Sequence, residues 1–192
     1  MHRFDLPDNL PVPVDDGQCA HLKVGMKFPI DILTSLPVTN KHSVDITSYP
    51  RTVIYFYPRT GKPDQKLPDG WDEIPGARGC TPESCGFRDH FQELQSLGAN
   101  VYGCSTQTTD YQQEVVERLH LPFDILSDSD LKLVNHLHLP YFTLPELENI
   151  PLIKRLTIIM KDDTIEHVFY PIFPTDKHAQ EVIDWLKQNP IK

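Results

Sequence analysis

Residues 76 to 89 read G-A-R-G-C-T-P-E-S-C-G-F-R-D and contain two of the four cysteines of the chain, Cys80 and Cys85. The Thr-Pro-Glu triplet after Cys80 indicates a helix start, because threonine can cap a helix, proline is tolerated in the first turn and glutamate suits the positive end. Apolar residues then recur at i, i+4 and i+7. They predict a helix with one apolar face that ends at Gly98: Phe87, Phe91 and Leu94.

A cysteine in the first turn of a helix lies beside unpaired backbone N–H groups and the positive end of the helix dipole. Both features favour the thiolate, which is the reactive form of cysteine. Such a position lowers a cysteine pKa from about 8.5 into a range of roughly 3.5 to 7.5. Cys80 is therefore predicted to be a nucleophile, and the alternative is a buried, inert thiol.

The sequence around these cysteines resembles the peroxiredoxin family. The similarity rests on Y-F-Y-P at residues 55 to 58 and on G-C-T-P-E-S-C-G-F-R-D at residues 79 to 89, and it extends over about residues 20 to 188. The most similar branch is the Q-type, or bacterioferritin-comigratory, group, in which a second cysteine follows five residues after the first. In this chain, an insertion precedes the reactive cysteine.

The resemblance implies a thiol-dependent peroxidase that reduces hydrogen peroxide and organic hydroperoxides. Cys80 would form a sulfenic acid, and Cys85 would resolve it as an intramolecular disulfide. A thioredoxin-type dithiol protein would then reduce the disulfide. Cys85 could instead be only a core residue of the same helix.

The family also implies roles for an arginine and a threonine. An arginine at the start of a late strand reaches the reactive sulfur in peroxiredoxins, and Arg155 has that position; Arg78 and Arg88 are rivals by nearness in sequence. A guanidinium suits this role because it stays charged and presents several fixed donors. Ala77 replaces the family threonine three residues before the cysteine. Thr60 could supply the hydroxyl if its loop folds back, or it could bond only local backbone.

The rest of the chain alternates strand and helix patterns. A β-branched and aromatic run at residues 52 to 57 predicts a strand buried on both faces. Strands at 101–104 and 123–126 and helices at 109–119 and 128–137 imply parallel βαβ units. An antiparallel hairpin at 155–160 and 165–170 and a helix from Asp176 follow. The predicted fold class is α/β, a thioredoxin-like three-layer fold with a central mixed sheet and flanking helices.

Three regions lie outside this pattern. Residues 1 to 20 are polar and rich in proline and aspartate, and they predict an extended N-terminal arm before a peroxiredoxin domain at residues 21 to 192. Residues 21 to 50 hold short apolar patches that predict a β-hairpin. Residues 59 to 79 contain three prolines and four glycines, and a structureless loop of this length is often functional.

Composition limits the partners and cofactors. The net charge of -9 argues against nucleic acid and anionic membranes. No apolar run approaches the ~18 residues that a membrane span needs, and the first residues lack a signal-peptide pattern. Four cysteines are too few for a disulfide scaffold, which favours a cytoplasmic location. No spacing matches a zinc site or a phosphate-binding loop, so neither a metal nor a cofactor is expected, and Cys19 and Cys104 are interpreted as non-catalytic.

Three alternatives remain open at this point. A single-cysteine peroxidase would keep Cys80 and use an outside thiol. A thioredoxin-like thiol–disulfide oxidoreductase would share the fold, although the usual Cys-x-x-Cys is missing. A non-catalytic binding or zinc module would consume no peroxide. The expected assembly is a monomer or a weak homodimer.

Helix geometry adds one expectation about the two cysteines. Residues i and i+5 of an α-helix have Cα atoms about 8.7 Å apart, which exceeds the ~7 Å limit for a disulfide. The reduced protein should therefore carry Cys80 and Cys85 apart on a regular helix, and the first turn should unwind on oxidation.

Overall fold

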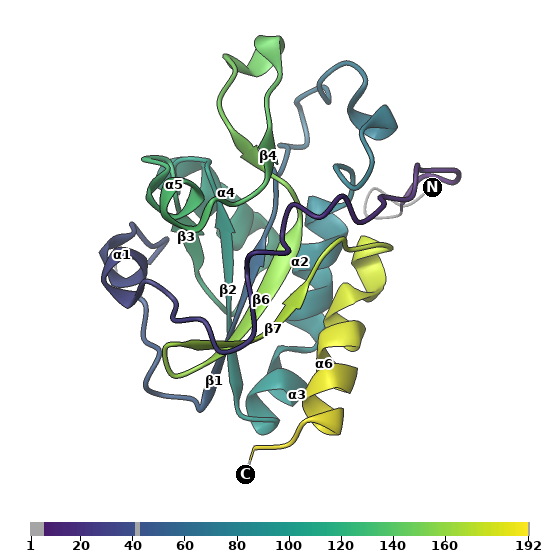
Figure 1. Cartoon of the computed structure of the whole chain (residues 1–192). Helices are drawn as coiled ribbons and strands as arrows, with labels where there is room; N and C mark the ends of the chain where they lie inside the picture. The colour runs from purple at the N-terminus through teal and green to yellow at the C-terminus, as the bar shows by residue number, and fades with distance from the viewer. Residues whose placement is uncertain (1–5, 41–42, 192) are drawn as a thin grey trace.

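The computed structural model describes residues 6–40 and 43–191, and a five-stranded sheet forms its centre (Figure 1). The strand order is β3-β2-β1-β6-β7. β1 pairs parallel with β2, and β2 pairs parallel with β3, whereas β6 is antiparallel to both β1 and β7. The sheet is therefore mixed, as predicted. Its strands are β1 (Arg51–Phe56), β2 (Ala99–Ser105), β3 (Ile125–Ser127), β6 (Leu156–Lys161) and β7 (Thr164–Phe169).

Helices cover both faces of the sheet, because β1 alternates its side chains between two apolar cores. Val53 and Tyr55 face the core that contains α2 (Cys80–Asp89), α3 (Phe91–Ser96), α4 (Thr109–Leu119) and α6 (His178–Gln188). Ile54 and Phe56 face the core that contains α1 (Ile30–Ser35) and α5 (Lys132–Leu137). All residues of β1 are buried, which confirms both the predicted central strand and the three-layer fold. In the described ranges, no helix has the length and apolarity needed to span a bilayer.

The helix predicted from Cys80 to Gly98 is divided into α2 and α3 at His90. The backbone of His90 has φ -103° and ψ 9°, which is outside the helical range. Hydrogen bonds from His90 N to Gly86 O and from Leu94 N to His90 O bridge the break. The apolar face is kept, since Phe87 and Leu94 are both fully buried.

The β-hairpin predicted within residues 21 to 50 is wrong. Pro29 precedes α1, and Leu33 of this short helix is fully buried in the core shared with α5. On either side of α1, the chain makes single bridges to the sheet, Lys27 with Thr164 and Val38 with Leu126. The apolar patches therefore pack onto the two outer strands of the sheet and do not pair with each other. Part of the predicted region, residues 41 and 42, lies outside the described residues.

Other boundaries move by a few residues, each for a local reason. The helix predicted from Asp128 begins at Lys132, because the Asp128 carboxylate accepts hydrogen bonds from the N–H groups of Leu133 and Val134 and caps the helix. The strand predicted at 123–126 lies at 125–127. The final helix begins at His178, after a short 3-10 turn, η3 (Thr175–Lys177).

A small second hairpin, which the sequence analysis missed, packs against the loop after β1. The hairpin is formed by β4 (Tyr141–Phe142) and β5 (Leu152–Ile153), joined through η2 (Pro145–Leu147). The loop at 59–79 contains the 3-10 turn η1 (Trp71–Glu73), and the rings of Trp71 and Phe142 lie 5.9 Å apart. Figure 1 shows the loop and the hairpin projecting from the same end of the sheet.

The N-terminal segment is extended and lies along the surface of the domain. The Asp16 carboxylate accepts hydrogen bonds from Lys154 Nζ at 3.1 Å and Tyr170 Oη at 2.8 Å. Cys19 is buried in the core of α1 and α5. The segment therefore packs against the domain, and the boundary at residue 20 stays a prediction.

Gly79 provides a test of how the backbone sets the start of α2. Its φ is +115°, and a Cβ at this position would lie 2.1 Å from Thr175 Oγ1. We expect Gly79→Ala to lower the free energy of unfolding by at least about 1–2 kcal/mol, because a left-handed backbone is unfavourable for residues with a Cβ. Urea unfolding followed by circular dichroism measures the change. In Gly61→Ala, the matched control, the new methyl group meets no atom within 4 Å; equal losses in the two variants would contradict the explanation.

Candidate active site

The candidate site lies where the carboxyl ends of β1 and β2 meet the start of β6. The loop at 59–79 follows β1, Gln107 follows β2, and Arg155 directly precedes β6. Because β1 and β2 are parallel and β6 is antiparallel to β1, these three segments come to the same edge of the sheet. Ligand sites of open α/β sheets are commonly found at this edge.

Cys80 is the first residue of α2 and is 4% exposed. Arg155 Nη2 donates a hydrogen bond to its sulfur at 3.1 Å, although the two residues are far apart in the sequence. The thiol also lies 3.8 Å from the carbonyl oxygen of Ala77. The structure thus brings together the predicted nucleophile and the predicted arginine.

The two rival arginines are engaged elsewhere. Arg78 Nη1 hydrogen-bonds to both carboxylate oxygens of Asp72, at 2.8 and 3.1 Å. Arg88 donates to Asp89 and to the carbonyl oxygen of Leu119. Arg155 is therefore the guanidinium that contacts the sulfur of Cys80.

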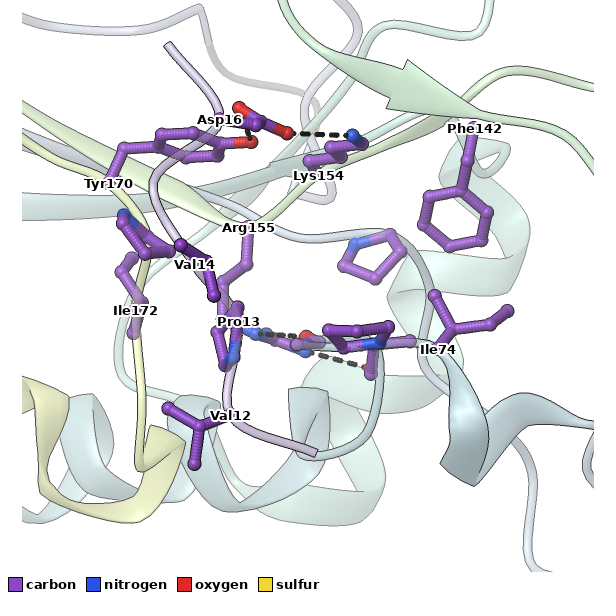
Figure 2. A pocket seen from close by; sticks show the side chains of 15 residues that line it. Val12, Pro13, Val14, Asp16, Ile74, Phe142, Lys154, Arg155, Tyr170 and Ile172 are labelled. Carbon is purple, nitrogen blue, oxygen red and sulfur yellow. Dashed lines mark hydrogen bonds and ion pairs between the residues drawn. The ribbon is translucent and has the colours of Figure 1, made fainter. Parts of the chain in front are cut away.

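Three acceptors hold the Arg155 guanidinium in place. Nε donates to Gly76 O at 3.2 Å, Nη2 to Ala77 O at 2.9 Å, and Nη1 to Glu83 Oε1 at 2.8 Å. The side chains of Arg155 and Glu83 are 2% and 0% exposed. Figure 2 shows Arg155, which directly precedes β6, reaching behind Pro13, with dashed lines to the carbonyl groups. Ala77, which occupies the position of the family threonine, therefore contributes its backbone carbonyl as an acceptor for Arg155.

Glu83 is the site residue that the sequence analysis missed, since it was interpreted only as a favourable charge at the helix end. Burial raises the pKa of its carboxyl group, and the positive charge of Arg155 lowers it against that effect. Its other oxygen, Oε2, is buried without a hydrogen-bond partner in the described structure. The spacing in the sequence could have indicated this role. Glu83 follows Cys80 by three residues, so both side chains lie on the same face of α2.

Burial and charge have opposite effects on the pKa of the Cys80 thiol. Loss of solvation is the largest effect and leaves the pKa of Cys80 above its ordinary value, while the charge and hydrogen bond of Arg155 and the backbone N–H of Arg59 lower it. This differs from the lowered pKa expected from the helix position alone, because that expectation did not include burial. Formation of the thiolate therefore depends on Arg155.

The structure places Thr60 near the cysteine but pairs it with another residue. Thr60 is 1% exposed and lines the same cavity as Cys80. Its hydroxyl and backbone N–H both bond to Gln107 Oε1, at 3.3 and 3.1 Å, and Gln107 Nε2 donates to Thr60 O at 3.0 Å. Thr60 thus fastens the loop to the end of β2, a contact that the sequence analysis did not foresee.

Cys85 lies on the same helix as Cys80, as the sequence analysis predicted. α2 is continuous from Cys80 to Asp89, so the two Cα atoms are separated by the geometry of an intact helix, about 8.7 Å. Cys85 is 8% exposed and packs in the core that contains Phe87 and α6. A disulfide between the two cysteines requires this segment to change conformation.

Cys80 lines one cavity and Arg155 lines another. The cavity that Cys80 lines has a volume of about 320 Å³ and is bounded by the loop at 59–79. The other, of about 430 Å³, lies under the N-terminal segment and between Val12, Pro13, Ile74 and Phe142 (Figure 2). Cys80 borders the first cavity and not the second, so this residue faces the side of the loop.

The remaining two cysteines lie away from these cavities. Cys19 and Cys104 are buried in the core that contains α1 and α5. Burial raises the pKa of both thiols, that of Cys19 to about 12. In the described ranges, no three His, Cys, Asp or Glu side chains are grouped so as to hold a metal ion.

A thioredoxin-like sheet with a cysteine at a helix start beside a buried arginine defines a class of thiol-based redox proteins. The chain belongs to the Redoxin family, whose model matches residues 23–183. Within it, the chain belongs with the peroxiredoxins of the Bcp and Q type. Peroxiredoxin Bcp of Escherichia coli is 31% identical over 160 residues, covering 81% of this chain and 91% of that protein. The chloroplastic peroxiredoxin Q of Sedum lineare is 28% identical over 138 residues, covering 70% of this chain and 62% of that protein.

Solved structures show the same fold. A mutant of PrxQ from Xylella fastidiosa superposes with a TM-score of 0.68 at 19% identity, covering 87% of this chain and 96% of that one. The peroxidoxin BcpB of Mycobacterium tuberculosis superposes with a TM-score of 0.66 at 23% identity, covering 86% of this chain and 97% of that one. The predicted fold class is thereby confirmed.

The contact between Arg155 and Cys80 can be tested through the pKa of the thiol. A charge-assisted hydrogen bond contributes roughly 1.5 to 3 kcal/mol, which corresponds to about one to two pKa units. Arg155→Met should raise the pKa of Cys80 by that amount, because the thiolate loses both the donor and the positive charge. Thiolate absorbance or the rate of iodoacetamide alkylation, followed against pH, measures the shift.

Arg78→Met is the matched control, since Arg78 lines the same cavity but pairs with Asp72. Arg155→Lys keeps the charge and should give an intermediate pKa. A larger shift from Arg78→Met than from Arg155→Met would assign the thiolate partner to the wrong arginine.

Proposed function

We propose that this chain is a thiol peroxidase that reduces hydrogen peroxide and organic hydroperoxides. The observation that carries the proposal is the 3.1 Å contact between Arg155 Nη2 and the sulfur of Cys80, at the wall of a cavity and at the first residue of a helix. The relatives named peroxiredoxin support the same reaction.

In the first step, the Cys80 thiolate attacks the terminal oxygen of the peroxide. The O–O bond breaks, Cys80 becomes a sulfenic acid, and the departing oxygen takes up a proton to leave as water or an alcohol. Arg155 stabilises the developing negative charge. Because three acceptors fix the guanidinium beforehand, its N–H groups are oriented without reorganisation during the reaction.

In the second step, the Cys85 thiol attacks the sulfur of the Cys80 sulfenic acid. A disulfide forms and water leaves, which protects the sulfenic acid from further oxidation. A thioredoxin-type dithiol protein then reduces the disulfide by thiol–disulfide exchange. The spacing of the two cysteines on α2 supports this order, provided that the first turn of the helix opens.

The role of Thr60, the location and the partners are proposed from hydrogen bonding, thiol chemistry and charge. Thr60 would support the site through Gln107, and a direct role of its hydroxyl would require that contact to break. We propose a cytoplasmic location, since the cycle needs reduced thiols. We also propose a monomer or a weak homodimer without nucleic-acid or membrane partners, in keeping with the net charge of -9.

Separate roles for the two cysteines predict different kinetic failures. Cys80→Ser should abolish peroxide consumption, because the nucleophile is lost. Cys85→Ser should complete one fast turnover and then stall as the sulfenic acid. Stopped-flow peroxide consumption with an intact-mass readout distinguishes the two.

Cys19→Ser serves as the control, because Cys19 lies in the opposite core. A near-normal rate for Cys80→Ser would refute the mechanism. Continued turnover of Cys85→Ser with thioredoxin as the only reductant would identify a single-cysteine peroxidase.

Helix opening on oxidation predicts a change in amide exchange. In the reduced protein, α2 is intact and its amides should exchange slowly. In the oxidised protein, amides from about Thr81 to Arg88 should exchange faster, because the disulfide cannot form across an intact helix. Gly86 provides a flexible hinge, and Pro82 contributes no N–H to the first turn.

Hydrogen-exchange mass spectrometry of both redox forms measures the effect, and α4 serves as an internal reference. Equal exchange of α2 in both forms, with the Cys80–Cys85 disulfide verified by mass, would show that the two cysteines do not share one helix.

A further inference from the structure

The N-terminal segment contacts the candidate site, although it lies outside the part of the chain that matches the family. The Redoxin match begins at residue 23, whereas residues 6 to 16 pack along the loop that leads to Cys80. We call residues 6 to 16 the N-terminal strap. The family match assigns no role to the strap, so its role has to follow from its own contacts.

The strap covers the last residues of the loop before α2. A Cβ on Gly79, the residue before Cys80, would lie 3.1 Å from Leu6 Cδ2. A Cβ on Gly76 would lie 3.5 Å from both Cβ and Cγ of Pro13. Between these two contacts, the strap lines a cavity together with η1 of the same loop. The loop therefore lies under the strap from η1 to the start of α2.

The covered part of the loop carries two of the three acceptors that hold Arg155. Gly76 O accepts from Nε at 3.2 Å, and Ala77 O accepts from Nη2 at 2.9 Å. The same Nη2 donates to the sulfur of Cys80 at 3.1 Å. Figure 2 shows Pro13 of the strap beside these carbonyl groups and the guanidinium. A displacement of the two carbonyl groups would therefore turn Nη2 away from the sulfur.

A carboxylate at the end of the strap fixes it to two strands of the sheet. Asp16 Oδ2 accepts from Lys154 Nζ at 3.1 Å, and Asp16 Oδ1 accepts from Tyr170 Oη at 2.8 Å (Figure 2). Lys154 directly precedes Arg155, and Tyr170 directly follows β7. Asp16 therefore anchors the strap next to the residue whose guanidinium contacts the sulfur.

The side chains of the strap alternate between the domain and solvent. Pro11 and Pro13 are half-buried. Val12 and Val14 are 63% and 82% exposed. Proline fixes φ at about -65°, which restricts the backbone of the strap before it packs. The strap is therefore stiff, and an anchor at Asp16 is enough to hold Pro13 in place three residues away.

We propose that the N-terminal strap positions Arg155 for the reaction with peroxide. Anchored by Asp16, the strap holds Pro13 against Gly76 and keeps the two carbonyl groups of the loop in place, so that Nη2 stays directed at the sulfur. Asp16 is thus a positioning residue, which acts through Arg155 and does not itself contact the sulfur. The inference rests on the proposed peroxidase function and adds to its site a segment outside the family match.

The pKa of the Cys80 thiol distinguishes positioning from a direct effect of charge. Asp16→Asn removes a negative charge and leaves Lys154 without its carboxylate, and both changes by themselves favour the thiolate and lower the pKa of Cys80. Loss of the Arg155 contact has the opposite effect, because that contact lowers the pKa. We expect Asp16→Asn to raise the pKa by about half a unit or more, which corresponds to an about threefold smaller thiolate fraction at neutral pH.

The pKa is measured as the midpoint of the pH profile of iodoacetamide alkylation, with Cys80 identified by peptide mass. Asp15→Asn is the matched control, because it makes the same change of charge one residue earlier. Asp15 accepts from the N–H of Gly17 and, in the described structure, bonds to neither Lys154 nor Tyr170. Its variant should show an unchanged or slightly lower pKa. Tyr170→Phe removes one donor to Asp16 without a change of charge and should raise the pKa by less than Asp16→Asn.

Two results would overturn the inference. A pKa of Cys80 in Asp16→Asn that is equal to or below that in Asp15→Asn would show that the strap does not act through Arg155. A lower free energy of unfolding in urea with an unchanged pKa would limit the strap to a structural role. Neither measurement needs peroxide. A raised pKa in a protein that consumes no hydrogen peroxide would instead refute the proposed peroxidase and leave the positioning of Arg155 in place.

Discussion

The site depends on the buried guanidinium of Arg155, which contacts both the Glu83 carboxylate and the Cys80 sulfur. Moving two charges out of water costs several kcal/mol for each ion, and Arg155 and Glu83 are both almost completely excluded from solvent. Their 2.8 Å pair and the carbonyl groups of Gly76 and Ala77 offset this cost. Since those acceptors occupy the guanidinium on three sides, a further N–H stays directed at Cys80. The same burial disfavours the Cys80 thiolate. Formation of the thiolate therefore depends on the stabilising charge and hydrogen bond of Arg155.

The fold assembles this contact from segments that meet at one edge of the sheet. β1 delivers the loop that carries Gly76 and Ala77, and the antiparallel direction of β6 places Arg155 at the same end. The loop is not an independent unit, because Thr60 is fastened to Gln107 and Trp71 packs on the β4–β5 hairpin. The loop therefore both supports the arginine and bounds the cavity that Cys80 lines.

α2 has to satisfy two opposing requirements. It must be ordered to present Cys80 to Arg155, and in the proposed cycle it must open to bring Cys85 within bonding distance. Helix hydrogen bonds contribute only about 1 kcal/mol net each, so opening a first turn is affordable for a domain of this size. The break at His90 separates α2 from α3, which allows the first segment to rearrange while Leu94 stays buried in the core.

The sequence by itself determined the features that depend on neighbouring residues: the central strand β1, the start of α2 at Cys80, and the alternation that gives a mixed α/β sheet. These follow from side-chain periodicity and capping chemistry, which act over a few residues. The family resemblance added Arg155, though not its partners. Only the tertiary structure decided that Glu83 is buried against that arginine, that Thr60 pairs with Gln107, and that residues 30–35 form a helix. Each of these depends on contacts between segments far apart in the chain, where burial and charge pairing outweigh local preference.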